Sequence, residues 1–291
     1  MLYLAVIAGL LAATFWGVSD YLGGNISRKI GQYRTTAYLS VFNTAVVFPV
    51  MLFFGINLGI SHWILFLAIV TSVAMFAAAL FMYKAYRFGS LSITAPIVNS
   101  YPSLVVLGAV FILGVAITKI EVISIAVILI GIVLLSIRKS ALKNGARITA
   151  LGTGSAVIAL VLYAVAFIFA GAYAKVIGFA LLTFIWDVTS IPLGFAALFA
   201  MKQKIIVKMS KKMIAAVVVS GAFLGFGMLS FMYPLFASGE VDLPIVSTLA
   251  SFAGGVTVIC ALLFLRERPE TNQWIGMVMA IVGVMVLSYF S

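Results

Sequence analysis

The chain has 291 residues, of which 65% are hydrophobic and 9% are charged, and its mean hydropathy is +1.27. A soluble domain carries about a quarter charged residues, so this composition excludes a chain that folds in water and predicts an all-α, polytopic membrane protein. The formal net charge of +11 comes from bases in short gaps between apolar runs. Basic residues that are confined to such gaps are typical of membrane topology signals. They form no continuous basic face, which argues against a nucleic-acid partner.

Ten apolar segments are candidates for membrane-spanning helices, each of which needs about 20 apolar residues. They lie at approximately 2–22, 35–55, 63–83, 92–113, 121–137, 149–170, 177–200, 213–237, 244–265 and 272–290. Cys260 is the only cysteine, so the sequence holds no disulfide framework and no CxxC pair. We expect ten transmembrane helices in a lipid bilayer, no metal or cofactor, and a monomer.

The first two spans supply three candidate site residues. Trp16 lies deep in span 1, which favours a pocket wall over an anchor at the membrane surface. Asp20, on the same helical face, lies nearer the cytoplasmic end and close to Arg28 and Lys29. A gate ion pair is one interpretation of Asp20, and a solvated helix end is the preferred one. Asn43 in span 2 is a further pocket candidate.

Span 4 carries small and polar residues on one helical face, namely Ser92, Pro96, Asn99 and Ser103. Asn99, Tyr101 and Pro102 together predict a locally irregular helix that lines a cavity. The alternative is a stripe of small residues that lets two membrane helices approach closely. Tyr83 in span 3 and Tyr163 in span 6 are additional pocket candidates.

Span 7 contains Asp187, the only ionisable residue that the span boundaries place near the bilayer midplane. An ionised carboxylate is costly there, so Asp187 should face an internal cavity, be protonated, or be paired. Thr183 and Ser190 share its helical face. The functional hypothesis is that Asp187 binds a cationic substrate group or carries a coupling proton. The alternative is a neutral structural acid that is hydrogen-bonded to a neighbouring side chain.

Spans 8 and 9 offer further polar side chains. Tyr233 lies near the end of span 8, and Ser247 and Ser251 share one side of span 9. Span 9 corresponds to span 4 in the internal sequence repeat described below. Its small polar residues predict either a cavity lining or, slightly favoured, close helix packing.

The chain repeats itself at about half its length. The triplet Phe-Met-Tyr at 81–83 returns at 231–233, and the segment 131–136 is echoed at 283–288. These repeats predict a first five-helix unit at 1–140 and a second at 148–291, joined by a basic linker at 138–147. Because five is odd, the second unit should insert upside down, and the basic residues of matching gaps do change sides. Inverted repeats are typical of secondary transporters.

The distribution of basic residues predicts the orientation. Of the 18 Lys and Arg residues, all but Lys119 and Lys175 lie in the gaps after spans 1, 3, 5, 7 and 9. The positive-inside rule places these gaps in the cytoplasm. We therefore expect a plasma-membrane protein with both termini outside the cytoplasm.

Several short motifs resemble those of the drug/metabolite transporter superfamily in its EamA-type branch. They are residues 15–20, the pair Tyr101-Pro102, and, as the best match, residues 265–268 with 273–276 and 283–284. The resemblance covers the full length and implies a transporter with five spans per half. Two departures stand out. Val115 replaces an expected acidic residue that Glu267 supplies in the second half, and family members commonly keep both termini in the cytoplasm.

The sequence thus favours a secondary active or facilitative transporter that works by alternating access between two inverted repeats. The expected substrate is a small metabolite, either an amino acid or another uncharged or cationic organic solute, and protons are a conceivable coupling ion. Glu267 lies at the start of span 10, where capping of a helix N-terminus is the favoured role and a gate the other. A channel and an intramembrane enzyme are the alternatives. The enzyme is disfavoured because a carboxylate dyad and suitable histidines are missing from the spans.

Overall fold

The computed structural model describes residues 2–57, 59–89, 91–136, 150–238, 242–265 and 270–290, and every structural statement below concerns these residues. Within them the regular structure is helical and contains no strand. The basic linker at 138–147 and Glu267 lie outside the described residues.

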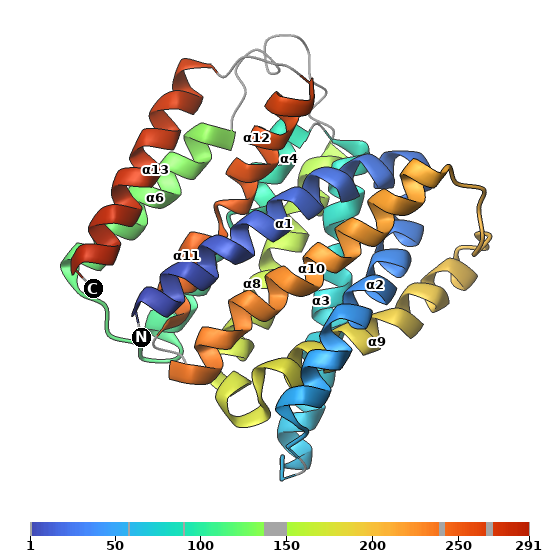
Figure 1. Cartoon of the computed structure of the whole chain (residues 1–291), viewed down its shortest axis with the longest axis horizontal. Coiled ribbons are helices and arrows are strands. Elements are labelled where there is room, and N and C mark those ends of the chain that lie inside the picture. The colour runs from blue at the N-terminus through green and yellow to red at the C-terminus, as the bar shows by residue number, and fades with distance from the viewer. Residues whose placement is uncertain are drawn as a thin grey trace.

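The helices follow the ten predicted segments, with two of the segments each divided in two. The first half contains α1 (Leu2–Ile30), α2 (Gln32–Phe54), α3 (His62–Phe88), α4 (Leu91–Val98), α5 (Tyr101–Phe111) and α6 (Lys119–Ser136). The second half contains α8 (Ala150–Ile177), α9 (Phe179–Ala200), α10 (Lys211–Ser238), α11 (Leu243–Ala250), α12 (Ala253–Leu265) and α13 (Thr271–Phe290). Figure 1 shows α1 and α10 side by side across the molecule, with α6 and α13 together at one edge.

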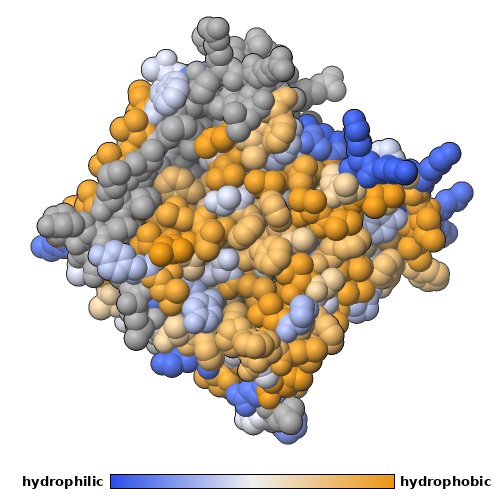
Figure 2. Space-filling model, viewed as in Figure 1, coloured by the Kyte–Doolittle hydropathy of each residue, from blue (hydrophilic) through white to orange (hydrophobic). Residues whose placement is uncertain are grey.

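The chain is a multi-pass membrane protein. Six helices, namely α1, α2, α3, α8, α9 and α10, are long and apolar enough to cross a membrane, and shorter apolar helices accompany them. Large apolar side chains point outward, such as Phe53, Phe111 and Phe199, each at least 80% exposed. So many exposed apolar side chains would be unfavourable in water, whereas lipid tails would cover them in a membrane. Figure 2 shows this apolar surface spread over the middle of the visible face.

Helix α1 extends eight residues beyond the predicted end of span 1 at residue 22. The prediction ended too early because polar residues interrupt the apolar run. Those polar residues are satisfied inside the protein, since the Ser27 hydroxyl donates to the carbonyl of Tyr83 at 2.8 Å. Helix α1 ends only at Gly31, whose φ of 88° is open to glycine but strained for other residues.

The junction of α8 and α9 repeats this arrangement. Gly178 has a φ of 96° and is the only residue between the two helices. In both junctions the glycine N–H donates to the carbonyl four residues earlier, and its own carbonyl accepts from the amide four residues later. Gly31 and Gly178 therefore make the same backbone contacts at the two junctions.

Predicted spans 4 and 9 are broken helices. Between α4 and α5 the helix is interrupted at Asn99 and Ser100, which confirms the irregular helix predicted there. Pro102 lies in the first turn of α5, where its missing N–H costs nothing. The interruption between α11 and α12 was not predicted. There the Ser251 hydroxyl donates to the carbonyl of Thr248 at 2.5 Å and competes with the helical pattern.

Contacts between the helices come in matched pairs. Helix α1 packs on α10, as α8 packs on α3, and α2 packs on α10, as α9 packs on α3. Likewise α1 contacts α11 and α12, whereas α8 contacts α4 and α5. The pairs α2–α9 and α6–α13 are their own counterparts. Exchanging residues 1–136 with residues 150–290 therefore carries each of these helix pairs into another pair of the set.

Basic residues from distant parts of the chain lie at one end of the bundle. The connection between α9 and α10 returns to α2, because Arg34 Nε donates to the carbonyl of Lys204 at 2.8 Å and the Tyr38 hydroxyl donates to the carbonyl of Ile205. Figure 2 shows hydrophilic residues gathered where Figure 1 places this connection, at the upper right. Basic residues of the predicted gaps after spans 1 and 7 therefore lie at the same end of the bundle.

Candidate functional site

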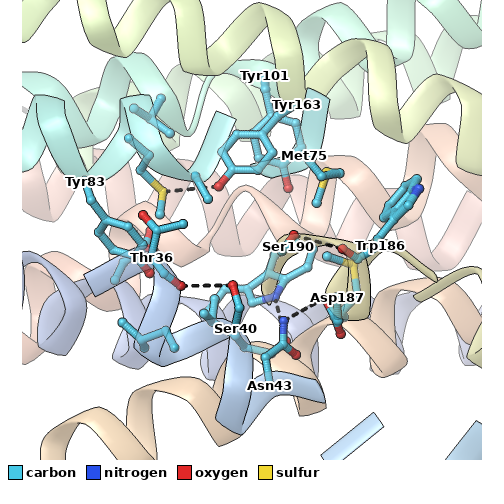
Figure 3. Close-up of a pocket in the computed structure, with 18 of the residues that line it drawn as sticks. Thr36, Ser40, Asn43, Met75, Tyr83, Tyr101, Tyr163, Trp186, Asp187 and Ser190 are labelled. Atoms are coloured by element: carbon cyan, nitrogen blue, oxygen red, sulfur yellow. Dashed lines mark hydrogen bonds between the residues drawn. The ribbon is translucent and has the colours of Figure 1, made fainter. Parts of the chain in front are cut away.

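A cavity lies among the helices of both halves. The space between its lining atoms is about 840 Å³, and this figure includes solvent at its open mouth. Figure 3 shows the side chains that converge on it. Its lining comprises Trp16, Asp20, Thr36, Leu39, Ser40, Asn43, Met75, Ala79, Met82, Tyr83, Val98, Asn99, Tyr101, Tyr163, Phe167, Trp186, Asp187, Ser190, Leu224 and Met228.

Asp187 of α9 is paired with Asn43 of α2 across the helix interface. The Asn43 amide nitrogen Nδ2 donates to Asp187 Oδ1 at 2.8 Å (Figure 3). The two side chains are 6% and 8% exposed. Within the described residues, Asp187 Oδ2 and Asn43 Oδ1 have no hydrogen-bond partner. Buried acceptors of this kind are rare and call for a proton, a water molecule or a ligand.

The hydroxyl groups near this pair are held by their own helices. Ser190 Oγ donates to the carbonyl of Trp186 at 2.8 Å, and Ser40 Oγ donates to the carbonyl of Thr36 at 2.9 Å. Each hydroxyl keeps lone pairs that can accept a further hydrogen bond. The wall around Asp187 therefore offers oxygen acceptors from both α2 and α9.

Asp20 of α1 is the second carboxyl group of the cavity. It is 5% exposed, and the Tyr86 hydroxyl donates to its Oδ2 at 3.2 Å. The Asn99 side chain, at the break between α4 and α5, lies close enough to interact with this carboxyl group, and its amide nitrogen donates to the carbonyl of Ala95 at 3.0 Å. The preferred interpretation of Asp20 as a solvated helix end is therefore wrong. It failed because α1 continues to Ile30 and carries Asp20 into the interior.

Four tyrosines surround Asp20 closely enough to interact with its charge: Tyr83, Tyr86, Tyr101 and Tyr163. The rings of Tyr101 and Tyr163 lie 5.6 Å apart between centroids, and those of Tyr83 and Tyr86 lie 6.3 Å apart. Among the described residues, the hydroxyls of Tyr83 and Tyr101 have no hydrogen-bond partner. We name these four residues the tyrosine cage.

Three further aromatic side chains complete the wall. The Phe167 ring lies 5.8 Å from Trp16 and 6.2 Å from Trp186, measured between centroids. Both indole N–H groups have acceptors, because Trp16 Nε1 donates to the carbonyl of Leu224 at 3.4 Å and Trp186 Nε1 donates to Thr71 Oγ1 at 3.1 Å. The tryptophans therefore offer ring surface to a ligand and no free N–H.

The lining has a clear electrostatic character. It contains the carboxyl groups of Asp20 and Asp187, and none of the described lining residues is Lys, Arg or His. Aromatic faces add negative charge density, which attracts cations. The cavity is therefore suited to a positively charged or hydrogen-donating group.

Hydrogen bonds close the bundle at the basic end, near the tyrosine cage. Arg28 Nε donates to the carbonyl of Tyr86 at 3.2 Å, which joins α1 to α3. The Arg87 guanidinium donates to Gln32 Oε1 at 2.7 Å, which joins α3 to α2. Phe179 follows Gly178 as Gln32 follows Gly31, and its ring packs 5.3 Å from that of Tyr233 between centroids. The residue after one junction glycine thus makes a polar contact, and the residue after the other makes an aromatic contact.

The structure brings together most residues proposed from the sequence. The predicted substrate-binding residues that line the cavity are Trp16, Asn43, Tyr83, Asn99, Tyr101, Tyr163 and Asp187. Four others lie outside it, namely Thr183, Tyr233, Ser247 and Ser251. Thr183 and Ser247 are fully buried and donate to carbonyls of their own helices, to Phe179 at 2.8 Å and to Leu243 at 2.5 Å.

Other lining residues were not singled out from the sequence. Ser40 and Thr36 lie one and two turns before Asn43 on α2, so the helical period was a usable signal for both. Met75, Phe167 and Met228 carried no such signal, because an apolar side chain in an apolar span looks the same whether it faces lipid or a cavity.

Comparisons with known proteins agree with this architecture. A model of the EamA-like transporter family matches residues 3–137 and, a second time, residues 150–289. The uncharacterized protein MJ1333.1 of Methanocaldococcus jannaschii is 32% identical over 88 residues, which are 30% of this chain and 62% of that protein. A protein of known crystal structure is similar over 99% of both chains, with a TM-score of 0.78 at 16% identity, and so shares the fold.

Proposed function

Since the chain belongs to the EamA-like transporter family of the drug/metabolite transporter superfamily, we propose that it carries small organic cations, such as amines, across the plasma membrane. The observation that carries this proposal is a cavity with two buried carboxyl groups, an aromatic wall and no basic residue among the described lining. A substrate carboxylate would meet two like charges there. Amines are therefore favoured over free amino acids, and anions are disfavoured.

Two inverted five-helix repeats, at 1–140 and 148–291, are part of the proposal. In this scheme α4 with α5 and α11 with α12 are single interrupted spans, which gives ten spans in all. The matched helix contacts support it. So does the cavity lining: counted from Gly31 and Gly178, Trp16 is equivalent to Tyr163 and Asn43 to Ser190, and all four line the cavity.

Transport by alternating access follows from such a duplication. The closed contacts at the basic end join α1, α2 and α3 of one half. In the inverted half, the equivalent contacts would close the opposite end. Rocking of the halves would open one set as the other forms, with the carboxyl groups between them. A channel remains the second candidate, because duplicated pores also exist.

A ligand panel tests the substrate class. In detergent, the purified protein should be stabilised by tetraethylammonium and butylamine, less by serine, and not by succinate, because bound ligand raises the unfolding midpoint. In proteoliposomes, uptake of the stabilising cation should saturate and show counterflow, as expected of a carrier and not of a pore. Stabilisation by succinate alone would refute the proposed substrate class.

The orientation of the basic end is also testable. We expect it to face the cytoplasm, which leaves both termini outside. A reporter that is active only in the cytoplasm should therefore be inactive at the C-terminus and active in the connection between α9 and α10. The reverse pattern would show that the protein inserts the other way up.

A further inference from the structure

The cavity holds its two carboxyl groups in different surroundings. Asp187 contacts the amide of Asn43, whereas Asp20 contacts Tyr86 and Asn99, so the two acids share no partner. They come from different halves of the chain. Counted from the two junction glycines, Asp20 corresponds to Phe167 and Asp187 to Ser40, so neither acid has an acidic counterpart. The duplication alone does not explain why both are present.

The surroundings of Asp187 suit a bound proton. Its Oδ2 and the neighbouring Asn43 Oδ1 are buried from solvent and lack partners among the described residues. A carboxylic acid and a primary amide pair through two bonds, an N–H to oxygen bond and an O–H to oxygen bond. The first of these is present at 2.8 Å. One proton on Oδ2 would supply the second and satisfy both free oxygens.

The surroundings of Asp20 are those of an organic ammonium site. The tyrosine cage places aromatic rings around a carboxyl group, the combination that recognises alkylammonium ions. The free hydroxyls of Tyr83 and Tyr101 add acceptors for the N–H groups of an amine.

We propose that the two acids divide the work of transport: Asp20 and the tyrosine cage bind the ammonium group of the substrate, and Asp187 with Asn43 binds the coupling proton. This assignment rests on the proposed function. The proton enters from water on one side of the membrane, bonds to Asp187 Oδ2, and leaves to water on the other side when access changes.

Few other charges act on the pair. Helix α9 packs against α2, α3, α8 and α10. The titratable side chains that these helices present to the cavity are Tyr83 from α3 and Tyr163 from α8, and α2 and α10 present none among the described residues. The remaining titratable lining residues are Asp20 and Tyr101. A pH dependence of coupling should therefore report mainly on the two acids.

Matched substitutions separate the two roles. Asp187→Asn keeps the shape of the side chain and mimics the protonated acid, and Asp20→Asn removes the charge from the tyrosine cage. Thr183→Val is the control, because Thr183 lies one turn from Asp187 but outside the cavity. The probe is tetraethylammonium, which carries a fixed charge and no proton. Binding is measured calorimetrically in detergent, and transport in proteoliposomes as counterflow and as uptake driven by a pH gradient.

For Asp20→Asn we expect tetraethylammonium binding to weaken by about 10- to 100-fold, the usual cost of a charged contact, with both kinds of transport reduced. For Asp187→Asn we expect binding and counterflow to persist while accumulation driven by the pH gradient is lost. Equal loss of binding in both variants would overturn the assignment, since the acids would then act as one site. Accumulation that survives in Asp187→Asn would overturn it as well.

An infrared measurement tests the proton position without any substrate. The wild-type protein should show the carbonyl band of a protonated carboxyl group that shifts in D₂O, disappears in Asp187→Asn and moves in Asn43→Ser. Absence of this band at neutral pH would refute the proton site, even if a variant failed to fold. A band in a protein that binds none of the panel cations would instead refute the proposed function and leave the proton site standing.

Discussion

An ammonium group tethered inside the cavity should abolish the transport of organic cations. Asn99 interacts with the Asp20 carboxyl group from the break between α4 and α5, so Asn99→Lys places a lysine amine where the substrate is proposed to bind. Two charges 4 Å apart interact by about 4 kcal/mol at an effective dielectric constant of 20. We expect tetraethylammonium affinity and uptake to fall on the order of 100-fold or more.

Asn99→Gln is the control for this substitution, because it lengthens the side chain without adding charge. It should retain most of the affinity. Thermal unfolding of both variants shows whether the fold survives. Unchanged tetraethylammonium affinity in a folded Asn99→Lys protein would contradict a cation site at Asp20.

The second large effect concerns the contact between α1 and α12. A Cβ atom at Gly17 would lie 2.5 Å from Val256 Cβ and 2.7 Å from the carbonyl oxygen of Ala253. The two backbones would have to separate, so Gly17→Ala should cost about 1–3 kcal/mol through overpacking. A lower thermal unfolding midpoint in detergent is the measured result. Transport should also fall, since Trp16 and Asp20 reach the cavity from the same helix.

Gly154→Ala provides the comparison. Gly154 lies in α8, and nothing is within 4 Å of the Cβ that alanine would add. Alanine also favours the helical conformation more than glycine does. The Gly154→Ala protein should be as stable as the wild type or slightly more so. If Gly17→Ala were equally harmless, the packing of α1 on α12 would be looser than the structure indicates.

Much of the site was predictable because polar residues are rare in this sequence. Asp187 and Asn43 stand out in apolar runs, where burying a polar side chain is costly unless it has a partner. Trp16 stood out as a large aromatic residue deep in its span. The pairing of Asp187 with Asn43 was not predictable, since a sequence gives no relative rotation of α2 and α9.

Other features depended on details that composition does not contain. Asp20 was misjudged because the apolar run ends near it, while the helix continues to Ile30. The interruption at Ser251 has no proline or glycine inside it and depends on hydroxyl groups that bond to nearby carbonyls. Ser247 and Thr183 have the expected burial, but their hydroxyls bond to their own helices and lie outside the cavity.

The links between helices differ greatly in length, and this has a practical use. Gly31 and Gly178 are each the single residue between two long helices. A domain inserted at either position would therefore force the two helices apart. The stretch between Ile206 and Lys208 follows the anchoring contacts of Lys204 and Ile205 and is largely exposed. Insertions succeed at exposed tips of this kind. A fiducial protein for single-particle imaging is therefore best spliced at that stretch.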